Sequence, residues 1–259
     1  MNTSKADIHS SYLEPTWFLD SDHPAVISFA RETTGNATDA AERAVRLFYA
    51  VRDGIRYDPY TSNLERETYK ASVIVQTHAN FCIPKAILLA AAARSLGIPS
   101  RLGFADVRNH LATERLLRLF RTDLFVFHGY TELFLNARWV KATPTFNASL
   151  CEKFNVKPLE FNGHDDALLH PFDREGKRYM DYVRDRGSHA DMPLEEMALA
   201  VQEVYPHLFD GDGQWLRMSE KTGDFEKEAE AEAQSGRRGS DRSHRGRRSP
   251  GSRKPSGTC

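Results

Sequence analysis

Apolar and polar residues alternate with the period of a helix in two segments of the chain. Between Asp39 and Val51, apolar residues recur every three or four positions, which predicts an amphipathic helix. From Cys82 to about Leu96 almost every residue is small or apolar, which predicts a helix buried on most of its sides. Gly97 and Pro99 follow this second segment, as is typical beyond a helix end.

A different pattern, rich in aromatic and β-branched residues, predicts strands in the middle of the chain. The expected strands are residues 100–105, 124–135 and 139–143, with a turn at 136–138 that joins the last two into a hairpin. Residues 106–119 are expected to form a basic, amphipathic insertion, and 194–204 a final helix. Helices combined with antiparallel hairpins predict an α+β fold.

The composition changes after about Met218. Residues 220–234 are acidic and rich in Ala and Glu, which predicts a short helix exposed to solvent. Residues 235–258 are almost only Ser, Arg, Gly, Pro and Lys, and such a segment buries too little apolar surface to fold. We therefore expect a folded domain over 1–218 and a disordered tail over 219–259, so that a chain ending near Met218 still folds.

The charge of the tail leaves two interpretations open. Between Gly236 and Cys259 there are eight Lys or Arg residues and one Asp, whereas the whole chain has a net charge of −1. Such a segment is either a contact for nucleic acid or a solubilising extension. No aromatic residues alternate with the arginines as stacking platforms, and this favours the second interpretation.

Composition also bounds the class of protein and its setting. Hydrophobic residues make up 40% of the chain, yet no apolar run is long enough for a transmembrane helix, and the N-terminus lacks the pattern of a secretory signal. The three cysteines, Cys82, Cys151 and Cys259, are widely spaced and form no CxxC pair. A disulfide framework or zinc cluster is therefore not expected, and we predict a reducing, cytoplasmic setting without a metal or cofactor.

Cys82 is the first candidate for chemistry. It stands where the buried helix is expected to begin, and the partial positive charge of a helix N-terminus favours the reactive thiolate. A nucleophilic cysteine needs a base, and His128 is the best candidate because it lies inside a strand expected to cross the core. Each residue has a plainer interpretation, Cys82 as a small buried hydrophobe and His128 as a core histidine.

Four motifs occur in one order along residues 40–146. They are Asn80-Phe81-Cys82, the run 91–101 that contains Gly97-Ile98-Pro99, His128-Gly129-Tyr130-Thr131-Glu132, and the run 139–145 that ends in Thr143-Pro144-Thr145. Together they resemble the transglutaminase-like superfamily, in its bacterial and archaeal form. The resemblance implies a papain-like cysteine hydrolase fold in which the helix bearing Cys82 packs on an antiparallel sheet. It also implies that Cys82 is the nucleophile and His128 its base.

The third catalytic position departs from that family, because Thr143 stands where the family has an aspartate. Thr143 can accept a hydrogen bond from an imidazole N–H but supplies no charge. Alternatively, Asn147 orients His128, or an acid from elsewhere does, such as Asp106 or Asp123. For the oxyanion hole, the candidate is Gln76, six residues before the nucleophile, which is otherwise an ordinary loop residue.

The resulting hypothesis is a thiol-dependent enzyme that acts on amide bonds, through a thioester, in a peptide, a protein or a small amide. Hydrolysis by water is favoured over protein cross-linking, as the resemblance implies. The alternative is a degenerate module of the same fold that binds proteins without catalysis, and Thr143 is the feature that favours it. Calcium, which animal transglutaminases use, is not expected, because the acidic residues around Asp165 and Asp166 lack the spacing of a calcium loop.

Overall fold

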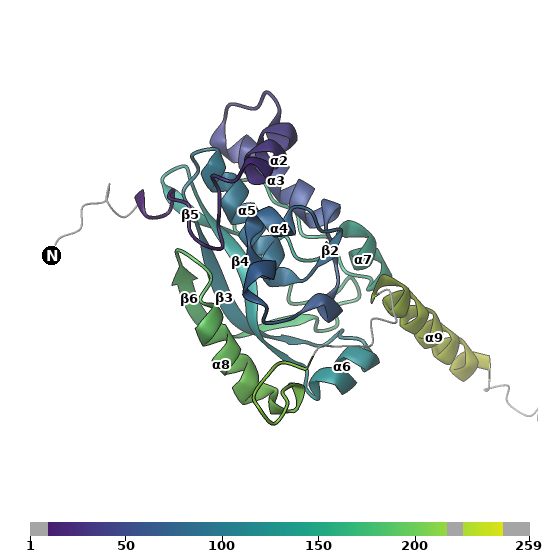
Figure 1. The fold of residues 1–259 in the computed structure, drawn as a ribbon. Helices are drawn as coiled ribbons and strands as arrows, with labels where there is room; N and C mark the ends of the chain where they lie inside the picture. The colour runs from purple at the N-terminus through teal and green to yellow at the C-terminus, as the bar shows by residue number, and fades with distance from the viewer. Residues whose placement is uncertain (1–9, 217–224, 246–259) are drawn as a thin grey trace, which may run out of the picture.

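The computed structural model describes residues 10–216 and 225–245, and its framework is one antiparallel sheet covered by helices (Figure 1). The strands lie in the order β5-β4-β3-β6. Their bounds are Ser100–Asn109 for β3, Leu124–Leu135 for β4, Arg138–Ala142 for β5 and Met180–His189 for β6. The long central strands β3 and β4 pair antiparallel, and β5 returns along β4 as the predicted hairpin.

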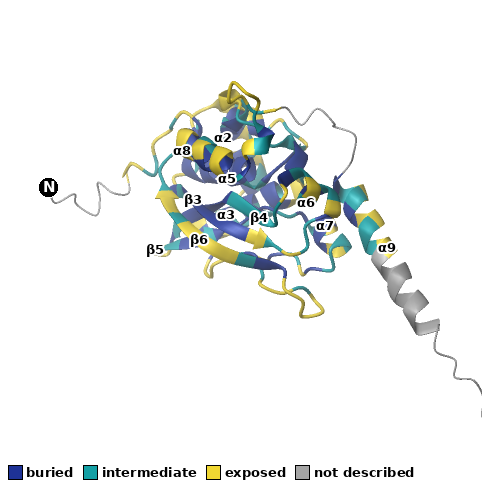
Figure 2. Cartoon of the chain, turned by 90° about the horizontal axis from the view of Figure 1, so that it is seen from below, coloured by how far each residue is buried: buried dark blue, intermediate teal, exposed yellow. Residues whose placement is uncertain are grey.

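Helix α5, Cys82–Ser95, is the central helix of the molecule. One side packs on β4 and β3, and the other is covered by α2 (Pro24–Thr34), α3 (Ala40–Gly54) and α4 (Ala71–Ile74). Every residue from Ile83 to Arg94 is buried, which explains why the sequence of α5 is almost uniformly small and apolar (Figure 2). The predicted buried helix is confirmed.

The remaining elements surround this core. They are β1 (Arg56–Tyr57), η1 (Pro59–Thr61), η2 (Arg66–Tyr69), β2 (Ala79–Asn80), α6 (Glu114–Phe120), α7 (Ala148–Lys153), α8 (Leu194–Val204), η3 (Pro206–Leu208) and α9 (Phe225–Arg245). The short strands β1 and β2 pair in parallel, with Tyr57 opposite Asn80. This pairing fixes the chain immediately before Cys82. None of the helices in the described ranges is long and apolar enough to cross a membrane.

The structure differs from the sequence-based expectation on the far edge of the sheet. Strand β3 does not end at Ala105 but continues to Asn109, so Asp106 lies in the sheet and not in an insertion. Strand β6 was not predicted, and it contains Arg186-Gly187, a dipeptide that in sequence resembles a turn. Most residues of β6 are exposed or half-buried, because it is an edge strand, so it lacks the alternation that marks a strand in sequence.

The C-terminal helix α9 also differs from the expectation of a solvated helix. Phe225 and Ala229 in its first turns are buried against the rest of the protein. The backbone remains helical to Arg245, within the stretch expected to be disordered, whereas residues 246–258 lie outside the described ranges. The acidic segment is therefore a docked element, because Phe225 and Ala229 at one end of the helix are buried.

Candidate active site

Cys82 is the first residue of α5, preceded by the N-cap residue Phe81. Its side chain is half-buried and lines a cavity. Burial raises the pKa of the Cys82 thiol to about 11, although the backbone N–H groups of Gly129, Ile83 and Cys82 itself act in the opposite direction and favour the thiolate. The resting thiol is therefore protonated near neutral pH and is already surrounded by hydrogen-bond donors.

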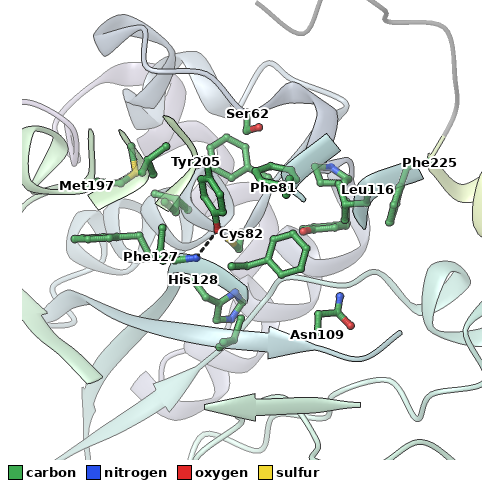
Figure 3. A pocket seen from close by; sticks show the side chains of 18 of the residues that line it. Ser62, Phe81, Cys82, Asn109, Leu116, Phe127, His128, Met197, Tyr205 and Phe225 are labelled. Carbon is green, nitrogen blue, oxygen red and sulfur yellow. Dashed lines mark hydrogen bonds between the residues drawn. The ribbon is translucent and has the colours of Figure 1, made fainter. Parts of the chain in front are cut away.

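His128 lies on β4 and lines the same cavity as Cys82 (Figure 3). Its side chain is buried, and its Nε2 atom makes no hydrogen bond within the described part of the chain. Burial lowers the pKa of His128 to about 4. The imidazole is therefore neutral at physiological pH and can accept a proton. The structure thus brings together the two residues that the sequence singled out.

A bulge in β4 sets the orientation of His128. The pairing with β3 shifts between Ala105 and Val107, and Phe127, next to His128, has a φ of 56°, a conformation that is rare for a phenylalanine. The Phe127 N–H donates to Asp106 Oδ1 at 3.1 Å. Since a bulge changes which way the following side chain points, Asp106 acts on His128 through the backbone.

The carboxylate of Asp106 is itself held by Arg186 on β6. Arg186 Nε and Nη2 donate to its two oxygens at 2.5 and 2.9 Å, and both side chains are buried. The guanidinium also lies over the ring of Phe127, at 4.5 Å from its centroid. Asp106, considered from sequence as an acid for His128, is therefore occupied by Arg186 and the Phe127 N–H. The other acid, Asp123, pairs with Arg108.

The candidates for orienting His128 lie in different surroundings. Thr143 is buried just after β5, and its Oγ1 makes no hydrogen bond within the described residues. Asn147 Oδ1 accepts from the Tyr57 N–H at 2.9 Å, and its Nδ2 donates to Ser149 and to Glu226 on α9. Both ends of the Asn147 amide thus join β1, α7 and α9, and none of these hydrogen bonds involves His128.

The oxyanion candidate Gln76 does not line the cavity, and its side-chain amide donates to the Ser72 carbonyl at 3.2 Å. The donors near the sulfur are backbone groups, among them the N–H of Cys82 itself and that of Ile83. The Gly129 N–H is a further donor, and it lies there because the backbone of β4 passes directly over Ile83 at the start of α5. A Cβ on Gly129 would come within 3.1 Å of the Ile83 backbone, so glycine permits this close approach.

Lys85 was overlooked in the sequence, although a single lysine in the first turn of an apolar helix is a visible signal. It is fully buried, and its Nζ donates to the carbonyls of Arg52, Ile55 and Thr145 at 2.8, 2.6 and 2.8 Å. Burial lowers its pKa to about 7. Lys85 thus joins the end of α3, the start of α5 and the segment after β5, and its charge favours the Cys82 thiolate.

The cavity beside Cys82 has a volume of about 110 Å³. Its wall comes from loops before α5, from β3, β4 and α8, and from Phe225 at the start of α9. Within the described ranges, no group of three or more His, Cys, Asp or Glu side chains is arranged to hold a metal ion. The chemistry available at the site is that of a thiol, an imidazole and backbone N–H groups.

Comparison with protein families finds a match over a little less than half of the chain. Residues 27–144 match the model of the transglutaminase-like superfamily. This part of the chain is therefore a transglutaminase-like domain, and its antiparallel sheet with α5 packed across it is the papain-like core expected from the sequence.

Two solved structures show limited similarity to the chain. One is a candidate cysteine protease from Cytophaga hutchinsonii, with 17% identity and a TM-score of 0.42 over 56% of this chain and 43% of the other. The second, a candidate protease from Parabacteroides distasonis, has 12% identity and a TM-score of 0.33 over 49% of this chain and 26% of the other. The chain thus spans less than half of either protein. No curated protein matches it.

Proposed function

We propose that the protein is a thiol-dependent acyl-transfer enzyme that acts on amide bonds, with Cys82 as nucleophile and His128 as base. The observation that carries this proposal is the shared cavity. Cys82 at the start of α5 and His128 on β4 both line it, and backbone N–H groups lie around the sulfur. A thiol, a neutral base and oxyanion donors are the parts that thiol acyl transfer requires.

The pKa shifts support transfer of the thiol proton during attack, without an ion pair formed beforehand. Both side chains are neutral at rest, since burial raises the pKa of Cys82 to about 11 and lowers that of His128 to about 4. As the sulfur bonds to the carbonyl carbon, His128 takes the thiol proton and later delivers it to the leaving amine. Water then attacks the thioester, His128 accepts a proton from it, and the carboxylic acid and free thiol form.

The position of Cys82 in a cavity supports hydrolysis over cross-linking of proteins. The thiol is half-buried among side chains from several elements, and water reaches such a site more easily than a lysine on another folded protein. The competing proposal is a non-catalytic binding module. It is favoured by one observation: within the described residues no carboxylate contacts His128, and Thr143 occupies the position of the family's aspartate.

Acyl trapping tests the proposal directly. The protein is incubated with p-nitrophenyl acetate or a panel of small amides, and acyl adducts are located by mass spectrometry. In the wild type we expect an acyl adduct on Cys82 that is then hydrolysed by water. The adduct should be absent in Cys82→Ala and present in Cys151→Ala, a control that removes the other free cysteine described by the structure. We expect turnover to be constant between about pH 5 and 10, because His128 protonates below this range and Cys82 ionises above it.

Thiol reactivity separates the two proposals further. Iodoacetamide labelling of Cys82 is followed across pH in the wild type and in His128→Ala. For an enzyme, the His128 variant slows acylation of Cys82 by a general-base contribution of about 10²-fold or more. If Cys82 forms no adduct with any substrate and His128→Ala leaves its labelling unchanged, the binding module is the better description.

A further inference from the structure

Among residues 10–216 and 225–245, those that line the cavity beside Cys82 carry no formal charge: not one is Asp, Glu, Lys or Arg, and His128 is neutral above about pH 4. Aromatic and aliphatic side chains make up most of the surface. They include Phe125, Phe127, Met197, Val201, Trp215 and Phe225.

The few polar atoms of the wall are mostly occupied within the protein. Tyr205 accepts from the Val126 N–H at 2.9 Å and donates to the Leu124 carbonyl at 2.8 Å (Figure 3). Ser62 Oγ and Trp215 Nε1, by contrast, are buried and make no hydrogen bond within the described part of the chain. Buried polar atoms normally have partners, so these two leave places for neutral polar atoms of a bound molecule.

The size and the polarity of the cavity together indicate which kind of chemical group it binds. The volume of about 110 Å³ compares with apolar cavities of roughly 150 Å³ that bind a benzene ring. A charged group that entered would lose its water shell and find no opposite charge, which is strongly unfavourable. An uncharged ring or branched aliphatic group gains from leaving water instead.

We propose that this cavity binds an uncharged aromatic or branched aliphatic group attached to the carbonyl that Cys82 attacks. The proposal rests on the proposed function and adds the class of substrate: amides with an apolar acyl part, in preference to those with a carboxylate or an amine there. Met197 and Val201 on α8 and Phe225 on α9 contribute apolar side chains to the wall against which this group would pack.

Binding is measured with Cys82→Ser protein, so that no reaction interferes. Isothermal titration compares 3-phenylpropanamide with propanamide, which lacks the ring, and with succinamic acid, which places a carboxylate there. We expect 3-phenylpropanamide to bind at least tenfold more tightly than either. Equal affinity for all three, or no binding of 3-phenylpropanamide, overturns the proposal.

A matched pair of variants locates the binding. Met197→Ala and Leu199→Ala lie two residues apart on α8, but Met197 is buried in the cavity wall whereas Leu199 is 68% exposed. In the Cys82→Ser background, we expect Met197→Ala to weaken binding of 3-phenylpropanamide severalfold and Leu199→Ala to leave it unchanged. Equal effects of the two variants contradict binding in this cavity. Binding without any turnover by the wild type refutes the proposed enzyme but not the apolar pocket.

Discussion

Removal of α9 is the most informative perturbation of this protein, because the sequence and the structure lead to different expectations. From sequence, a chain that ends at Met218 loses only solvated or disordered residues. In the structure it loses a helix whose first residues are docked, with Phe225 and Ala229 buried. The edge of Phe225 also packs against the rings of Tyr57 and Tyr60, with centroids 5.7 and 5.8 Å apart.

The magnitude follows from the groups that become exposed. Burial of a phenylalanine stabilises by about 1.5–3 kcal/mol, and the methyl group of Ala229 by about 0.8 kcal/mol. Glu226 adds an ion pair with Lys153 at 3.1 Å, worth about 1 kcal/mol or less, and Glu228 accepts from Tyr60 at 2.9 Å, a hydrogen bond to a charged group worth about 1.5–3 kcal/mol. The entropy of ordering the helix offsets part of this sum. We expect truncation to lower the free energy of unfolding by about 2–4 kcal/mol.

The assay is thermal and urea unfolding of the full chain and of the chain that ends at Met218. For a domain of this size the expected loss lowers Tm by roughly 4–15 °C while cooperative folding is retained. Phe225→Ala in the full chain must lower the free energy of unfolding by no more than the truncation does, because the helix can undock instead of leaving a void in the core. Phe172→Ala, at a site 53% exposed, is the control and should cost less than about 0.5 kcal/mol.

Alkylation of Cys82 provides an independent measurement of the same contact. Phe225 forms part of the cavity wall, so its removal should accelerate iodoacetamide labelling of Cys82 severalfold. If truncation changes Tm by less than about 1 °C and leaves this labelling rate unchanged, the docking of α9 is refuted, and the acidic segment is the solvated helix that its composition predicts.

Three further predictions concern buried polar groups. Lys85→Met should lower the free energy of unfolding by about 2–4 kcal/mol, because three buried carbonyls lose their donor, whereas Lys157→Met at the surface should change it by less than about 0.5 kcal/mol in urea titrations. In the folded protein His128 holds its proton more weakly, with a pKa of about 4, so the unfolded chain binds more protons between about pH 4 and 6.5. The free energy of unfolding must therefore decrease as the pH is lowered through this range. Urea unfolding should show a loss of about 2 kcal/mol from pH 7 to pH 5 attributable to this residue, and His128→Gln should lack it. Asp106→Ala should cost about 3–5 kcal/mol, since it leaves a buried guanidinium unpaired, and should slow turnover; the surface variant Asp123→Ala should do neither.

Elements with a strong local signal were predicted well from sequence. The helix of residues 39–51 is α3, capped by the Asp39 side chain, which accepts from the Glu42 N–H at 2.9 Å. The final helix, the hairpin of β4 and β5 and the buried helix α5 also lie where expected. In each case the periodicity or the end signal is contained within about fifteen consecutive residues, so no knowledge of the fold is required.

Features that depend on partners distant in the chain were not predicted from the sequence. Strand β6 is defined by pairing with β3 and carries little apolar alternation of its own. Asn147 was a candidate for orienting His128, but its amide joins Tyr57 and Glu226, which are 90 and 79 residues away. Nothing in the local sequence of Asn147 indicates either partner.

By itself, the sequence determined the secondary elements around the site and the match of residues 27–144 to the transglutaminase-like superfamily, and it singled out Cys82 and His128 as candidates for chemistry. These properties follow from local periodicity and from motifs in a fixed order. Only the tertiary structure decided what surrounds them: the Gly129 N–H beside the sulfur, the Asp106–Arg186 pair behind the bulge, and a cavity whose described lining residues carry no formal charge and include Phe225 of α9. The physical reason is that burial and long-range hydrogen bonds set the pKa values and the shape of a site, and both arise only when the chain is folded.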